Sequence, residues 1–123
     1  MAHQHPQRKI KIRGKEKECD ERLVPILPGL NDLLFSANFQ DWGSVASCEG
    51  EGFNGYVCFE KNGLSFWWEA GRIAFKVMAP LCKEMVWTEV VWQPPDIFRV
   101  FLRFHSCAIS EIEEGLLSLI IQD

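Results

Sequence analysis

The sequence lacks any apolar run of the roughly 18 residues that a membrane-spanning helix requires. Its opening stretch, MAHQHPQRKIKIRGK, contains basic residues but no apolar core of a secretion signal. Internal repeats and low-complexity tracts are also missing. From these absences we expect a soluble chain that does not enter a membrane and stays in the cytoplasm.

Recognisable catalytic motifs are missing as well. The chain has no nucleophile elbow, no HExxH, no P-loop and no dinucleotide fingerprint, so we expect no cofactor. Its five cysteines are an odd number without a Cys-x-x-Cys pair, which indicates reduced thiols that act as small core side chains. His3 and His5 are interpreted as tail residues, and no metal site is predicted.

What the chain does contain is typical of one compact domain. It has 123 residues, of which 47% are hydrophobic and 24% charged. Six basic and two acidic residues give residues 1–18 a charge of +4, and since the whole chain carries −4, the remainder carries −8. We therefore divide the chain into a basic segment, 1–18, which is a partly disordered arm or an edge strand, and a single α+β domain, 19–123.

Two turn signals lead to the central structural prediction. Asn62-Gly63 is suited to a type I′ hairpin, and Ala70-Gly71 could close a second one, so residues 56–79 are predicted to form three antiparallel strands. Alternation would then place one apolar set on the inner face, namely Val57, Phe59, Leu64, Phe66, Trp68, Ile73, Phe75 and Val77.

Other segments complete the predicted fold. Residues 28–35 and 110–121 have helical periodicity, whereas 85–93 and 97–105 favour strands and 16–21 is compatible with a helix. Residues 40–54 are loop-like, with a short strand at 45–48. The expected fold is an antiparallel β-meander of about five strands, with N-terminal and C-terminal helices packed on one face.

The outer face of this sheet is the predicted binding surface. Alternation directs aromatic and basic side chains away from the helices, and tryptophan and arginine are enriched at binding hot spots. An alternative is that residues 40–54 cover this face and make it a second small core. The predicted binding residues are Trp67, Arg72, Arg99, Phe101, Arg103 and His105.

Three functional hypotheses follow. The first is a cytosolic module that binds another protein, for instance an immunity-type inhibitor whose acidic body captures a basic toxin or nuclease. The second is a small-molecule or single-stranded nucleic-acid binding domain that uses Trp67 and Phe101, although the acidic charge disfavours nucleic acid. The third is an enzyme built on His105, Cys107 and Glu89. An unpaired sheet edge would also permit a dimer.

Overall fold

The chain begins with a tight hairpin. The computed structural model describes residues 5–121, in which β1 (Gln7–Ile12) pairs antiparallel with β2 (Lys15–Asp20). Arg13 and Gly14 form the turn with φ of 52° and 84°, the positive values that a type I′ turn needs at both positions. The basic segment therefore forms a strand. Residues 16–21, which the sequence makes compatible with a helix, do not form an α-helix, because residues 16–20 lie on β2, where Glu16 and Glu18 are exposed and Cys19 and Asp20 are buried.

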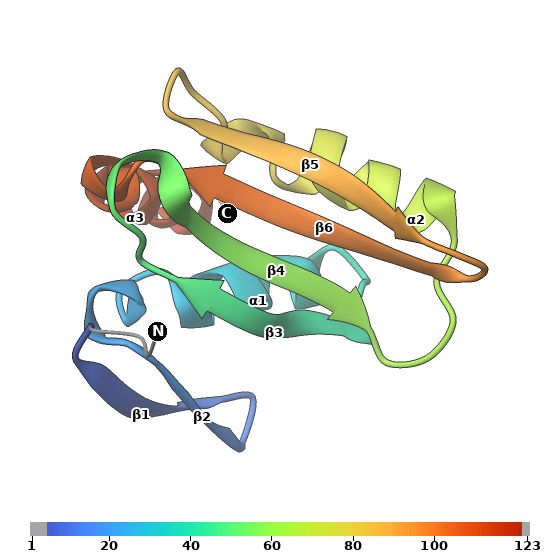
Figure 1. Cartoon of the computed structure of the whole chain (residues 1–123), viewed down its shortest axis with the longest axis horizontal. Helices are drawn as coiled ribbons and strands as arrows, with labels where there is room; N and C mark the ends of the chain where they lie inside the picture. The colour runs from blue at the N-terminus through green and yellow to red at the C-terminus, as the bar shows by residue number, and fades with distance from the viewer. Residues whose placement is uncertain (1–4, 122–123) are drawn as a thin grey trace.

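The remaining elements are two pairs of consecutive strands, with a helix before, between and after the pairs (Figure 1). They are α1 (Leu27–Ser36), β3 (Trp42–Cys48), β4 (Gly55–Lys61), α2 (Trp67–Arg72), β5 (Val86–Gln93), β6 (Ile97–Phe104) and α3 (Ile109–Ile121). Short helical turns occur at Glu21–Leu23, Gly52–Asn54, Ala79–Leu81 and Ser106–Ala108, and a π-helical turn at Ile73–Val77 continues α2. None of the helices within residues 5–121 combines the length and the apolar character needed to cross a bilayer.

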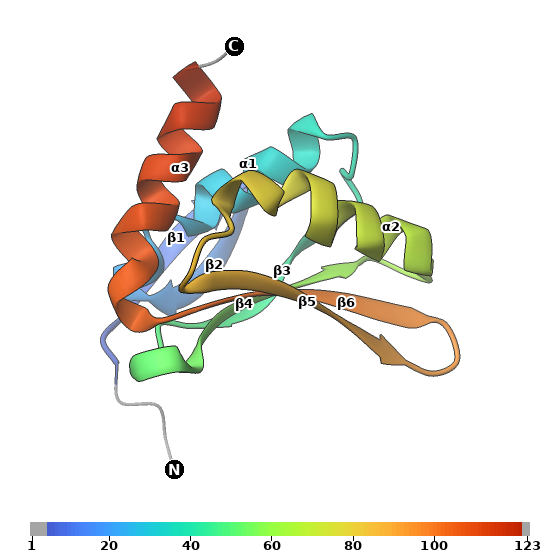
Figure 2. The same ribbon diagram turned by 90° about the horizontal axis from the view of Figure 1, so that it is seen from above.

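Four of the strands form the main sheet, in the order β3-β4-β6-β5, with every neighbouring pair antiparallel. Figure 2 shows α1, α2 and α3 on one side of this sheet, whereas the short turn Gly52–Asn54 lies on the other. The α+β class and the antiparallel sheet are thus confirmed. The five-strand meander is not formed, because β4 pairs with β6 instead of with the residues that follow it.

The predicted second and third strands of the meander are wrong. Asn62-Gly63 does not occupy a hairpin tip; the Asn62 amide donates a hydrogen bond to the Asp41 carbonyl oxygen, 2.8 Å away. The chain then turns into α2, whose first amides are capped by a side chain. The Glu69 carboxylate accepts from the Phe66 amide at 3.0 Å and forms an ion pair with Lys61 at 2.9 Å.

Burial explains why this segment is helical. Ala70, Ile73, Ala74 and Met78 are buried, with the i, i+3, i+4, i+8 spacing of one helix face. Phe66, Trp68 and Phe75, which the strand interpretation placed in the core, are instead exposed. The two small alanines let α2 pack closely on the sheet, so the segment buries small side chains and leaves its rings outside.

Both other helix predictions are confirmed. Pro28 lies in the first turn of α1, where its missing amide hydrogen costs nothing, and Leu30 and Leu34 are fully buried. α3 begins at Ile109, so that Ser110 lies inside its first turn instead of capping it. The hairpin β5–β6 also matches the prediction, with Val100, Leu102 and Phe104 buried.

A glycine permits the closest contact inside the sheet. Gly55 is the register partner of Phe104, and a Cβ atom at position 55 would lie 2.3 Å from the Phe104 ring. The ring therefore packs directly over the glycine backbone. This contact joins the start of β4 to the end of β6, where the buried Phe104 enters the core.

Replacing Gly71 with alanine tests whether residues 67–77 are helical. A Cβ atom there would contact nothing within 4 Å, and Gly71 lies inside α2, so we expect a gain of about 0.5–1 kcal/mol in unfolding free energy. If Gly71 instead lay in a turn that requires positive φ, the same substitution would lower the unfolding free energy. The control is Gly63→Ala, where φ is 111° and alanine should cost about 1–3 kcal/mol. Urea unfolding followed by circular dichroism measures both.

Candidate functional site

The fold divides the six predicted binding residues between two surfaces. Arg99, Phe101 and Arg103 lie on β6 and point away from the helices, and His105 follows that strand. Trp67 and Arg72 belong to α2, on the helical side of the sheet (Figure 2). The predicted joint surface of Trp67 with Phe101 is therefore not formed.

The outward face of the sheet is a paired network of rings and charges. The Phe101 ring centroid lies 6.0 Å from that of Tyr56 and 4.6 Å from the Arg103 guanidinium carbon. Arg103 Nε is 2.9 Å from Glu89 Oε1, and Trp87 Nε1 donates to Glu89 Oε2 at 3.0 Å. Arg99 is likewise paired with Glu60. Because these arginines already have carboxylate partners, the face offers little unpaired positive charge to a phosphate.

Residues 40–54 do not cover this face as a loop. Residues 42–48 form β3, which is part of the sheet itself. Only the turn Gly52–Asn54 crosses one end, where the Phe53 ring lies 4.5 Å from His105 and 6.1 Å from Trp87. The outward face is thus half-buried by its own side chains and covered only near His105.

The residues of the enzyme hypothesis are engaged elsewhere. His105 Nδ1 accepts a hydrogen bond from the Cys107 backbone amide at 3.1 Å, which caps the turn that leads into α3. The Cys107 sulfur lies 3.9 Å from Met85 Sδ, and the Glu89 carboxylate is bound by Trp87 and Arg103. This geometry contains no hydrogen bond between the thiol and the imidazole.

Burial also governs the thiols of the outward face. Burial, followed by the nearby Glu60 carboxylate, raises the pKa of Cys58 to about 11. A thiol with such a pKa is almost entirely protonated near neutral pH and is a poor nucleophile. Cys58 is thus a core side chain, as the sequence analysis expected of the cysteines.

The pKa of Glu89 allows a pH test of this network. The Trp87 hydrogen bond, and next Arg103, lower the pKa of Glu89 in the folded state. Its contribution to stability is therefore complete above the ordinary value of 4.5 and is lost as the pH falls through the lowered pKa. Since the side chain is 42% exposed, solvent screening keeps this contribution below about 1 kcal/mol.

We expect Glu89→Gln to lower the urea midpoint near neutral pH and to leave it almost unchanged well below the ordinary glutamate pKa of 4.5. The matched control is Glu114→Gln, which changes an exposed residue of α3 and should leave the urea midpoint unchanged at both pH values. An equal loss for Glu89→Gln at both pH values would show that packing, not charge, explains its effect.

A second surface, which the sequence interpretation missed, gathers at the start of α2. We call it the aromatic patch: Leu64, Phe66, Trp67, Trp68 and Phe75, each between 52% and 71% exposed. The Phe66 and Trp68 rings stack with centroids 6.4 Å apart and an interplanar angle of 13°. The exposed basic side chains of Arg72 and Lys76 lie on the same helical segment.

Hydrogen bonds hold the patch on a rigid base. The Ser65 amide donates to the Asp96 carbonyl oxygen at 3.1 Å, and Ser65 Oγ accepts from the Phe98 amide at 2.7 Å. Farther along, Thr88 Oγ1 donates to the Ala74 carbonyl oxygen at 3.1 Å. These bonds attach both ends of the segment to the β5–β6 hairpin, which bears the exposed Trp92.

A helical interpretation of residues 66–78 would have found part of the patch. Once the buried alanines are placed on one face, Trp68, Arg72 and Phe75 fall on the opposite face at i, i+4 and i+7. The chain matches no family model, and searches of curated proteins and of solved structures found no similar protein. Function is therefore argued from these surfaces alone.

Proposed function

We propose that this protein is a small protein-binding module that holds its partner through the aromatic patch. The observation that carries the proposal is the exposure of five large apolar side chains on one short segment, in a chain that buries a continuous core elsewhere. Large contiguous apolar surfaces on small proteins generally mark interaction sites. Scattered single apolar residues would not support the same argument.

The composition and stiffness of the patch favour tight binding. Trp67 and Trp68, with Arg72 beside them, are of the residue types that dominate interface energetics. The segment is anchored by the Glu69 cap and by the Ser65 hydrogen bonds, so little conformational entropy is lost when a partner is bound. A pre-organised aromatic surface is a suitable hot spot.

Charge suggests two classes of partner. In the immunity-type form of the proposal, the negative charge of residues 19–123 steers a basic toxin or nuclease, and the patch then makes the contact. Arg72 and Lys76, however, lie beside the patch and would complement an acidic spot on the partner at short range. Added salt distinguishes the two classes, since it slows association strongly only where long-range attraction speeds it.

The proposal is tested by placing a photo-crosslinking amino acid at position 67 and identifying the protein captured in the native cell. The matched control carries the same amino acid at position 117, an exposed leucine of α3, at the other end of the sheet (Figure 2). A partner captured from position 67 but not from 117 supports the proposal. Equal capture at both positions would contradict it.

With that partner purified, we expect Trp67→Ala and Phe75→Ala each to weaken its affinity by about 30-fold, as for hot-spot residues. Leu117→Ala should leave affinity within about twofold. Because all three side chains are exposed, each variant should keep the wild-type unfolding free energy, measured in urea, within about 0.5 kcal/mol. Unchanged binding of both patch variants would refute the interface.

The same variants also test two other possible occupants of the aromatic patch, namely a second copy of the chain and a membrane surface. A dimer in sedimentation that is lost in Trp67→Ala would identify a second copy as the occupant. Binding of the protein to lipid vesicles that is lost in Trp67→Ala would identify a membrane surface. Either result would replace the heterologous partner proposed above.

A further inference from the structure

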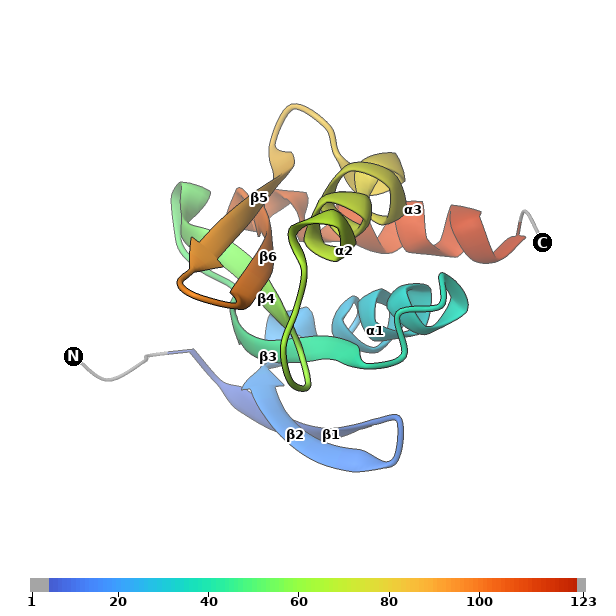
Figure 3. The ribbon, with the colours of Figure 1, turned by 90° about the vertical axis from the view of Figure 1, so that its right-hand side faces the viewer.

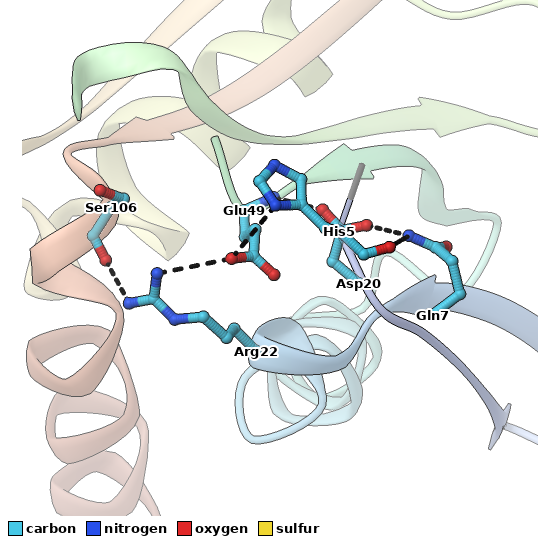
Figure 4. Close-up of polar contacts among 6 residues, drawn as sticks. All are labelled: His5, Gln7, Asp20, Arg22, Glu49 and Ser106. Carbon is cyan, nitrogen blue, oxygen red and sulfur yellow. Dashed lines mark hydrogen bonds and ion pairs between the residues drawn. The ribbon is translucent and has the colours of Figure 1, made fainter. Parts of the chain in front are cut away.

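A polar cluster lies where the N-terminal hairpin meets the end of the main sheet, at a distance from the aromatic patch. Figure 4 shows His5 from the segment before β1, Asp20 from the end of β2 and Glu49 from just after β3 converging on one place. Cys48, the last residue of β3, adds a thiol. The ligand atoms of His5, Asp20 and Cys48 all lie within 4.8 Å of one another.

The carboxylate of Glu49 is the unusual member of this cluster. Its side chain is 7% exposed, and its Oε1 atom is buried without a hydrogen-bond partner. Its other oxygen, Oε2, lies 3.5 Å from both His5 Nδ1 and Arg22 Nη1. A buried carboxylate oxygen without a hydrogen-bond partner is costly, so it points to the binding of a further group at this place.

Negative charge exceeds positive charge at this place. Asp20 is 1% exposed; one of its oxygens accepts from the Glu49 amide at 2.7 Å, and the other accepts from the Gln7 side chain. Arg22 is the cation closest to Glu49, and it also donates to the Ser106 carbonyl oxygen at 2.9 Å (Figure 4). A second cation would relieve the repulsion between two buried carboxylates.

We propose that His5, Asp20, Cys48 and Glu49 bind one zinc ion. A donor set of imidazole nitrogen, thiolate sulfur and carboxylate oxygen suits a borderline-soft divalent metal and does not suit calcium or magnesium, which prefer oxygen alone. Zinc bonds of about 2.0–2.3 Å place ligand atoms about 3.3–3.8 Å apart. The ligand atoms of His5, Asp20 and Cys48 would therefore approach one another by about 1 Å on binding, and the Glu49 carboxylate, which is not part of that group of three, would turn toward the ion.

Four protein ligands make this a structural site, since a catalytic zinc keeps one position open for water or substrate. The ligands come from three separate segments, so that the ion would tie the residues before β1 and the end of β2 to the end of β3. His3 lies outside the described residues, and the site does not need it. The proposal does not depend on the protein-binding role of the aromatic patch.

Cobalt substitution provides the direct test. The full chain, treated with a chelator and then titrated with Co²⁺, should bind one equivalent. A thiolate-to-cobalt band in the near ultraviolet should appear together with the visible bands of tetrahedral cobalt, and Zn²⁺ should abolish both. Cys48→Ser should remove the thiolate band, and His5→Ala should weaken cobalt binding by at least about tenfold. Absence of the band in the wild-type chain would overturn the proposal.

Two control variants locate the ion. Cys107→Ser removes an exposed thiol and His3→Ala removes the other N-terminal histidine, and both should retain the spectrum. Loss of the band in either control would place the metal elsewhere. A thiolate-to-cobalt band that persists in Cys48→Ser would likewise show that the metal binds elsewhere.

Alkylation of the wild-type chain gives a result that does not depend on how the variants fold. Zinc should protect Cys48 from iodoacetamide, measured by peptide mass spectrometry, without changing the alkylation of Cys107. Zinc at about 100 times its Kd should also raise the thermal midpoint by about 10 °C. Equal alkylation of Cys48 with and without zinc would refute the site.

Discussion

The pairing of β4 with β6 is the constraint on which the rest of the structure depends. Both β4 and β5 are antiparallel to β6, so they run in the same direction with β6 between them. A chain that joins two strands of the same direction has to return along the sheet before the second strand starts. That return is made by α2 and the helical turns after it, which cover the sheet and expose the aromatic patch.

The sequence predicts those elements whose local pattern permits one interpretation. α1, α3 and the β5–β6 hairpin have a single clear periodicity, and each is found close to its predicted place. Residues 64–78 fit two periods, since Leu64, Phe66 and Trp68 have the spacing of a strand. The buried residues have the spacing of a helix face, and they are Ala70, Ile73, Ala74 and Met78. The choice between these periods is made by β6, which begins 36 residues after the end of β4 (97 − 61) and takes the position beside β4 in the sheet.

The same distinction applies to the functional surfaces. Alternation along β6 correctly places Arg99, Phe101 and Arg103 on the outward face, because a strand imposes its period on its own side chains. Trp67 and Arg72 were misplaced together with their segment. The cluster of His5, Asp20, Cys48 and Glu49 has no sequence signature, since its members meet only when a hairpin packs against the end of a sheet.

The placement of the five cysteines, none of which forms a disulfide, has a consequence for handling and for the cell. Only Cys107 is exposed, whereas the others are buried or half-buried. Cys107 follows the C-terminal end of β6. The other end of β6 lies beside the start of α2, at the right of Figure 1. Figure 3 views the molecule from that side. An oxidant would therefore join two molecules tail to tail through this thiol, and the covalent pair would present its two ring-bearing ends outward, as a bivalent particle.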